Sequence, residues 1–114
     1  MSPITTHVLD TARGCPAQGV PVVLEFQTSD GVWKELARGE TDSDGRVKDL
    51  LPDGAGLESG FYRLTFETQV YFKSSGVRGF FPFVAITFDI GEPEPHYHVP
   101  LLLSPYGYST YRGS

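Results

Sequence analysis

A chain of 114 residues with 39% hydrophobic and 20% charged residues has the composition of a soluble globular protein and is long enough to form its own core. Its net charge of −5 argues against nucleic acid as the main partner, because the nine basic residues are dispersed and the overall field repels phosphate. The single cysteine, Cys15, excludes an internal disulfide framework and fits a reducing compartment. We expect one domain over residues 1–114.

The sequence predicts neither a membrane span nor a secretory leader. It has no run of about 18 apolar residues, and Met1 leads directly into strand-like sequence rather than into a charged and then apolar segment. A cytoplasmic location without a membrane partner is therefore expected. For a eukaryotic source a peroxisomal location is the alternative, although no targeting signal such as a terminal Ser-Lys-Leu is present.

Short runs with the two-residue alternation of β-strands recur along the chain, separated by clusters of glycine, proline, aspartate and serine. The predicted strands are Thr5–Leu9, Val20–Gln27, Val32–Glu40, Phe61–Thr68, Phe80–Ile90, His98–Leu103 and Tyr106–Arg112. The alternation weakens over Glu67–Ser74, which lacks glycine and proline and predicts a short helix with Val70 and Tyr71 facing the core. Strands at this spacing predict an all-β fold, an antiparallel β-sandwich with one short helix.

Three histidines could transfer protons near neutral pH or bind a metal. His96 and His98 flank Tyr97, so in a strand they point to the same face, whereas His7 lies in the first predicted strand. A catalytic zinc would need all three as ligands, and therefore the first strand beside that of His98. A His-x-His pair is a weak metal signal, and ordinary histidines at strand ends are the alternative interpretation.

The segment ETDSDGR resembles the start of a calcium-binding EF-hand loop, but the position of the bidentate glutamate is occupied by Leu51. We interpret Asp44-Gly45 instead as a tight turn between two strands that presents Arg46, whose forked donors suit carboxylates, carbonyls and ureas. No Gly-x-Ser-x-Gly elbow occurs, and no local feature marks Cys15 as an activated nucleophile. If the protein is an enzyme, these residues favour acid–base activation of water with positive groups around an anionic intermediate.

The last residues, YGYSTYRGS, alternate like a strand and then stop at Arg112-Gly113-Ser114. Packing of an ordinary edge strand would explain Tyr106 and Tyr108, but it does not explain an ending in Arg-Gly-Ser.

Four stretches resemble the 5-hydroxyisourate hydrolases, the transthyretin-like enzymes of urate breakdown: TTHVLDTARGCPAQGVPVVL, TDSDGR, GFFPFVAITFDI and HYHVPLLLSPYGYSTYRGS. The resemblance covers nearly the whole chain, and the terminal Tyr-Arg-Gly-Ser is the family's hallmark. It implies a transthyretin-like β-sandwich that hydrolyses 5-hydroxyisourate, a product of urate oxidase, to 2-oxo-4-hydroxy-4-carboxy-5-ureidoimidazoline. In that reaction water opens a ring amide, and neither a cofactor nor a metal is required.

The resemblance also assigns site residues. It places the catalytic groups on His7, Arg46 and His98, while His96 is less certain because the family varies more at that position. The implied substrate-binding residues are His7, Arg46, Tyr111, Arg112, Gly113 and Ser114. The two catalytic histidines would position and deprotonate a water while the two arginines hold the substrate, and which histidine accepts the proton stays open.

The resemblance further implies a homotetramer, a dimer of dimers with a central channel that the last strand lines. Two alternatives remain on the same scaffold. One is a non-enzymatic carrier of a hydrophobic aromatic ligand, which would need apolar or small residues where this chain has His7, Arg46, His98 and Tyr111. The other is a zinc-dependent amidohydrolase, which insensitivity to chelators would exclude.

Overall fold

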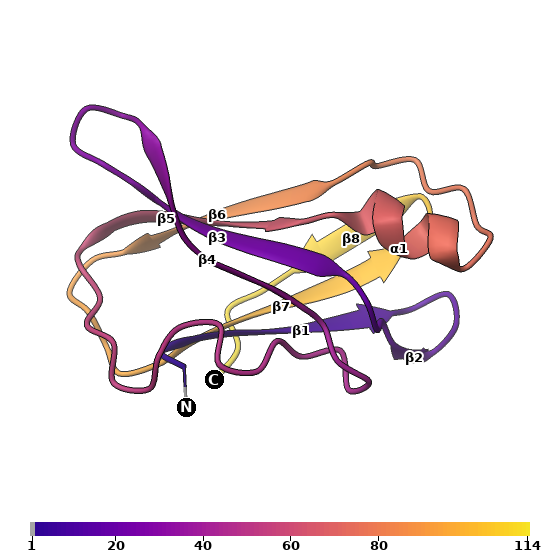
Figure 1. The fold of residues 1–114 in the computed structure, drawn as a ribbon, viewed down its shortest axis with the longest axis horizontal. Coiled ribbons are helices and arrows are strands. Elements are labelled where there is room, and N and C mark those ends of the chain that lie inside the picture. The colour runs from indigo at the N-terminus through magenta and orange to yellow at the C-terminus, as the bar shows by residue number, and fades with distance from the viewer. Residues whose placement is uncertain (1) are drawn as a thin grey trace.

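The computed structural model describes residues 2–114, which form two four-stranded sheets packed against each other and one short helix (Figure 1). The elements in chain order are β1 (Ile4–Asp10), β2 (Cys15–Pro16), β3 (Pro21–Gln27), β4 (Trp33–Glu40), β5 (Gly60–Phe66), α1 (Thr68–Ser74), β6 (Val84–Ile90), β7 (Tyr97–Ser104) and β8 (Gly107–Thr110). The first sheet has the order β2-β1-β7-β8, and the second has the order β4-β3-β5-β6. No helix in this part of the chain is long and apolar enough to cross a bilayer.

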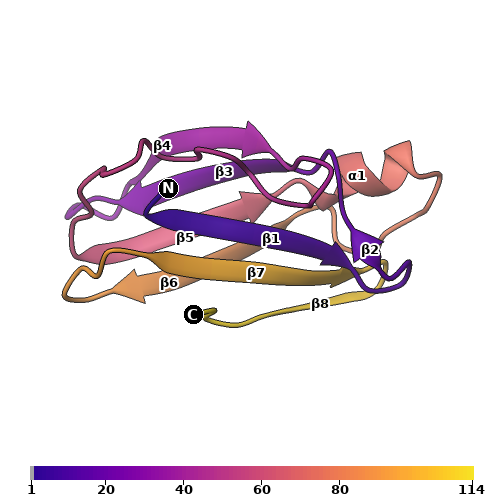
Figure 2. The same ribbon diagram turned by 90° about the horizontal axis from the view of Figure 1, so that it is seen from below.

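The predicted β-sandwich with one short helix is confirmed, with one difference in strand direction. β1 and β7 pair in parallel, whereas the other pairings between named strands are antiparallel. This parallel pair joins the first and the seventh strand of the chain at the centre of the first sheet. Figure 2 shows β1, β7 and β8 side by side, with the C-terminal tail continuing along β7 toward its beginning.

Several predicted strand boundaries differ from the observed ones, and one short strand was missed. The strand expected to begin at Phe80 begins at Val84, because Pro82 has no amide hydrogen for a sheet ladder. The last strand ends at Thr110 rather than Arg112, and the two-residue strand β2 was not predicted.

Helix α1 forms over nearly the predicted range but buries a different face. Its buried side chains are Thr68, Tyr71 and Phe72, which are spaced as the apolar stripe of a helix requires. Tyr71 therefore faces the core as predicted, whereas Val70 is 50% exposed, so its prediction was wrong.

The core between the sheets follows from alternation along the strands. In β1 the side chains of Ile4, Thr6, Val8 and Asp10 are buried, so Thr5, His7 and Leu9 lie on the outer face of the first sheet. In β7 the residues at 97, 99, 101 and 103 are likewise buried, which places His98 on the same outer face. The fully buried large side chains of the core include Tyr62, Phe66, Ile4, Leu24, Leu64, Ile90, Leu101 and Leu103.

A buried carboxylate attaches α1 to the first sheet. Asp10, at the end of β1, accepts a hydrogen bond of 2.6 Å from the hydroxyl of Tyr71 and bonds of 3.1 Å from the backbone N–H groups of Ala12 and Arg13. Burial, and then the neighbouring carboxylate, raises the pKa of Tyr71 above its usual value, so the phenol stays protonated and continues to donate. The contact fixes the end of β1 and, with it, the strand that carries His7.

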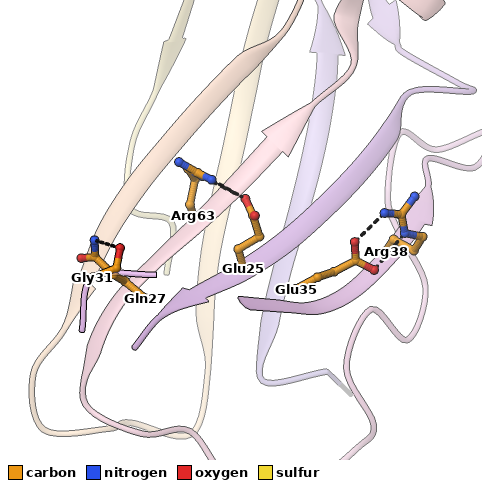
Figure 3. Close-up of polar contacts among 6 residues, drawn as sticks. All are labelled: Glu25, Gln27, Gly31, Glu35, Arg38 and Arg63. Atoms are coloured by element: carbon orange, nitrogen blue, oxygen red, sulfur yellow. Dashed lines mark hydrogen bonds and ion pairs between the residues drawn. The ribbon is translucent and has the colours of Figure 1, made fainter. Parts of the chain in front are cut away.

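The outer face of the second sheet is covered by paired charges (Figure 3). Arg63 of β5 forms an ion pair of 2.8 Å with Glu25 of β3, directly across the strands, and its guanidinium lies 4.2 Å from the ring centre of Trp33. Arg38 donates to Glu35 at 2.9 Å within β4. Both arginines of this face are therefore already paired with acids of the same sheet.

Candidate active site

The parallel register of β1 and β7 brings two predicted site histidines onto one surface. Thr5 lies opposite His98, and His7 lies opposite Pro100 two positions further along. Because side chains two residues apart in a strand share a face, His7 and His98 both point outward from the first sheet. Both are partly exposed, so a small molecule can reach them.

A turn after β4 delivers Arg46 to the edge of the same surface. The N–H of Gly45 donates to the carbonyl of Asp42 at 2.9 Å, and the N–H of Asp42 donates to the carbonyl of Arg46 at 2.8 Å. The backbone of Arg46 then forms an isolated bridge with His7. The predicted turn is therefore confirmed, but a single bridge to β1 follows it rather than a strand.

Glycine is required at the centre of this turn. Gly45 has a φ of 77°, and a Cβ built there would lie 2.4 Å from the carbonyl oxygen of Val8. The close approach allows the N–H of Val8 to donate to the Gly45 carbonyl at 2.8 Å, which fastens the turn to β1. The position of Arg46 next to His7 is thus set by backbone contacts rather than by its flexible side chain.

One hydroxyl connects the two late histidines. The Oγ1 of Thr5 lies 2.8 Å from the Nε2 of His96 and 2.8 Å from the Nδ1 of His98. The two imidazoles are stacked, with ring centres 6.3 Å apart and an angle of 17° between their planes. The prediction that His96 and His98 share a face is therefore confirmed, and Thr5 is a member of the cluster that the sequence analysis missed.

The surroundings of His98 favour its neutral form. Burial lowers the pKa of His98 below its ordinary value of 6.5, and the positive charges of Arg46, His96 and His7 lower it further. A backbone hydrogen bond with Thr5 opposes this shift and raises the pKa. Near neutral pH the ring is therefore uncharged and can accept a proton.

The tail returns to His98 through Gly113. Its N–H donates to the carbonyl of His98 at 2.8 Å, and the two residues form an isolated bridge. A Cβ at position 113 would lie 2.6 Å from the Cδ2 atom of the His98 ring, so a larger residue would displace the imidazole. Ser114, which follows, is exposed.

Two other predicted tail residues face a different part of the molecule. Arg112 forms an ion pair of 3.0 Å with Glu94, and its guanidinium lies 4.9 Å from the ring centre of Tyr97, which is buried on the inner side of β7. Tyr111 and Arg112 line a pocket at the open edge of the sandwich, between β8 and the side chains of Ile86 and Phe88 in β6. A single chain thus brings together His7, Arg46, His98 and Gly113, whereas substrate binding by Tyr111 and Arg112 stays a prediction.

The three histidines do not form a metal-ligand cluster in the described part of the chain. In residues 2–114, no three histidine, cysteine, aspartate or glutamate side chains lie close enough together to hold an ion. The carboxylate of Asp42, which the calcium interpretation would have used, accepts the backbone N–H groups of Asp44 and Arg46 at 2.9 and 3.1 Å. The bond from Arg46 and, to a smaller degree, the bond from Asp44 lower the pKa of Asp42, and both hold its carboxylate within the turn.

The chain is similar to known proteins in both sequence and fold. Residues 4–113 match the model of the HIUase/Transthyretin family. The chain is 51% identical over 111 residues to a 5-hydroxyisourate hydrolase of Salmonella dublin, which covers 97% of this chain and 80% of that relative.

Two solved structures of related proteins have the same fold as this chain. Sea bream transthyretin in complex with thyroxine superposes with a TM-score of 0.91 at 32% identity, covering 98% of this chain and 95% of that one. The 5-hydroxyisourate hydrolase of Klebsiella pneumoniae superposes with a TM-score of 0.84 at 39% identity, covering 99% and 100%. One of these structures is an enzyme and the other is in complex with thyroxine. The residues of the site must therefore decide between catalysis and ligand binding for this chain.

Proposed function

The chain belongs to the HIUase/Transthyretin family, and on this premise we propose that it hydrolyses 5-hydroxyisourate to 2-oxo-4-hydroxy-4-carboxy-5-ureidoimidazoline in urate degradation. The family resemblance predicted from the sequence is thereby confirmed. The relatives that carry the hydrolase name match this chain over nearly its entire length. The enzyme is a hydrolase whose reaction uses water and the protein's own side chains.

The observation that supports this function best is the combination on one open surface of a neutral imidazole and a guanidinium. His98 can accept a proton because its pKa is lowered by burial and then by Arg46, His96 and His7. Among residues 2–114, the side chain of Arg46 forms no ion pair, so its donors are available to a ligand. A carrier of hydrophobic ligands would gain nothing from these groups, because desolvating them costs binding energy.

The proposed reaction begins with a water held between His7 and His98. One imidazole accepts a proton as the water oxygen attacks the ring carbonyl of the substrate. Negative charge that develops on the carbonyl oxygen is stabilised by Arg46, whose guanidinium is fixed at the edge of the site by the turn. The C–N bond of the ring then breaks, and the departing nitrogen takes up the proton.

The tail supplies the rest of the proposed site. Gly113 packs against the His98 ring and keeps it in place. We assign substrate contacts to Tyr111, Arg112, Gly113 and Ser114 in a homotetramer, a dimer of dimers in which the tails of neighbouring subunits meet. In this assembly Arg112 would exchange its contact with Glu94 for the anionic substrate, whose planar ring would lie against Tyr111.

We further propose a cytoplasmic location, because the single cysteine, Cys15, is a free thiol, which suits a reducing compartment.

A coupled assay tests the proposal. The substrate is generated in place from urate with urate oxidase, and its ultraviolet absorbance is followed with and without the protein in the presence of a chelator. Acceleration of the decay is expected. An unchanged decay with a folded protein would contradict the hydrolase and favour a carrier, as in the thyroxine complex of the sea bream relative.

A further inference from the structure

The Thr5 hydroxyl has two imidazole partners but only one hydrogen to give. It lies 2.8 Å from the Nε2 of His96 and 2.8 Å from the Nδ1 of His98. A hydroxyl carries a single hydrogen, so it can donate to at most one of these nitrogens and must accept from the other. The contact therefore links the protonation of one histidine to that of the other.

Counting hydrogens leaves three arrangements. In the first, the Nδ1–H of His98 donates to Thr5, and the Thr5 O–H donates to the Nε2 of His96. In the second, both donations are reversed, and the neutral His98 then carries its proton on Nε2. In the third, both nitrogens donate to the Thr5 oxygen. The first and the third arrangements leave the Nε2 of a neutral His98 with a free lone pair, which a general base needs.

The proposed function distinguishes these arrangements. The nitrogen that takes a proton from water needs a free lone pair, and the Nδ1 of His98 is already engaged with the Thr5 hydroxyl. Nε2 can be the proton acceptor only if Nδ1 carries the ring proton and donates it to the Thr5 oxygen. The 2.8 Å contact between Nδ1 and the Thr5 hydroxyl provides that acceptor.

We propose that Thr5 is a positioning residue: with His96 as acceptor for its hydroxyl, it holds His98 in the tautomer whose Nε2 lone pair can take the proton from the attacking water. The inference deepens the proposed function and rests on it. It assigns the role of base to His98 rather than His7, since in this single chain His98 has its second nitrogen anchored in this way. It also gives His96 a role, as the partner that orients the Thr5 hydroxyl.

Nitrogen NMR of the labelled histidine rings tests the proposal directly. The chain has three histidines, so each signal can be assigned with a single substitution. In the wild-type protein just above neutral pH, we expect His98 to be protonated at Nδ1 and bare at Nε2. Thr5→Val, which keeps the shape and removes the hydroxyl, should move population toward the Nε2–H tautomer, whereas Thr5→Ser should preserve the wild-type tautomer.

Kinetics connect the tautomer to the reaction. For histidines that bind a metal, loss of the group that orients the ring costs about 10- to 100-fold in affinity or activity. We expect a loss of this size in the kcat of Thr5→Val with little change in KM, and near-complete rescue in Thr5→Ser. Thr6→Val is the matched control, because the Thr6 hydroxyl donates to the Val99 carbonyl and contacts neither histidine. It should lose stability without changing the His98 tautomer or kcat.

Three results would overturn the proposal: a wild-type His98 protonated at Nε2, an unchanged tautomer in Thr5→Val, or full activity in Thr5→Val despite a changed tautomer. Failure of the proposed function is distinguishable from these results. An inactive wild-type protein would contradict the hydrolase assignment, while the NMR spectrum would still establish whether Thr5 sets the tautomer.

Discussion

The two outer faces of the sandwich use their charged residues in opposite ways. On the outer face of the second sheet, Arg63 and Arg38 each have an acid beside them, as the 2.8 Å pair of Arg63 with Glu25 shows (Figure 3). On the first sheet, Arg46 and the histidines have no such acid among the ion pairs of residues 2–114. The face with neutralised charges contributes to solubility and packing, whereas the face with available donors and a neutral base can act on a ligand.

The difference originates in backbone connections. Glu25 and Arg63 lie opposite each other in neighbouring antiparallel strands, where opposite charges stabilise the pairing. Arg46 instead reaches the first sheet from a turn that is held by the Val8 N–H and by its bridge to His7. The fold thus places a cation beside two imidazoles rather than beside an acid. Burial lowers the pKa of His98 most, and the charge of Arg46 lowers it further.

The largest effect is expected for removal of the proposed base. His98→Ala should lower kcat/KM by about 10²- to 10⁴-fold, the contribution of general base catalysis. The oligomeric state, measured by size-exclusion chromatography with light scattering, should not change, because the side chain lies on an open face. Turnover close to that of wild type would remove His98 from the mechanism.

Arg46→Ala should be nearly as damaging. Loss of a group that stabilises developing negative charge costs about 10²- to 10³-fold in kcat. Arg46→Lys keeps the charge but loses the forked geometry, so it should recover only part of the activity. Steady-state kinetics should therefore give the highest kcat for wild type, a lower value for Arg46→Lys and the lowest for Arg46→Ala. Full activity of Arg46→Ala would contradict the proposed role.

Gly113→Ala tests the contact between the tail and the base. The added Cβ would lie 2.6 Å from the His98 Cδ2 atom, so the ring must shift. Misplacing a catalytic group by about 1 Å can cost on the order of 100-fold, and we expect a decrease of about 10- to 100-fold in kcat. Ser109→Ala, at an exposed residue of β8 with no assigned substrate contact, is the control for a change near the tail. Equal activity of both variants would show that the ring position is not critical.

The pH dependence should reveal the neutral state of His98. Its folded pKa is below 6.5 because of burial first and then Arg46, His96 and His7. Activity should therefore persist below pH 6.5 and fall as pH drops through the folded pKa, where the base becomes protonated. The free energy of unfolding should change in the same direction. The contribution of the neutral His98 ring to stability is fully present above pH 6.5 and is lost as the pH falls through the lower pKa of the folded state.

Arg46→Ala sharpens this prediction. Removing one of the positive charges should move the acidic limb of kcat/KM upward, toward the ordinary histidine value. If the acidic limb of the kcat/KM profile does not move, it reports the titration of a group other than His98.

The smallest effect is expected on the other face. Arg63→Met breaks the ion pair with Glu25 but keeps the aliphatic stem over Trp33. Because exposed or partly exposed pairs contribute little, the free energy of unfolding should fall by about 1 kcal/mol or less. Turnover should equal that of wild type, as measured by denaturant titration and the coupled assay on the same preparation. A marked loss of turnover would mean that the two faces are not separate in function.

Local patterns in the sequence predicted much of the fold and part of the site. Alternation placed His7 on one strand and His98 on another, and the Asp-Gly turn before Arg46 was recognised from its residue types. The turn could be predicted because its geometry depends on neighbouring residues, such as the positive φ of Gly45.

Contacts between distant parts of the chain could not be predicted from local sequence patterns. The parallel pairing of Thr5 with His98 joins residues 93 positions apart, and nothing in either strand specifies the partner. Thr5 was missed for this reason, although its position two residues before His7 places both on one face. Val70 was misplaced because seven residues of helix give a weak apolar period, and β2 is too short to show alternation.

The most direct test of the account compares both faces in one experiment. The decay of freshly generated 5-hydroxyisourate is followed with wild type, His98→Ala and Arg63→Met at equal concentration and in the presence of a chelator. The account predicts fast decay with wild type and Arg63→Met, and decay near the uncatalysed rate with His98→Ala. Equal decay with all three proteins would contradict the claim that the open face of the first sheet is the catalytic surface.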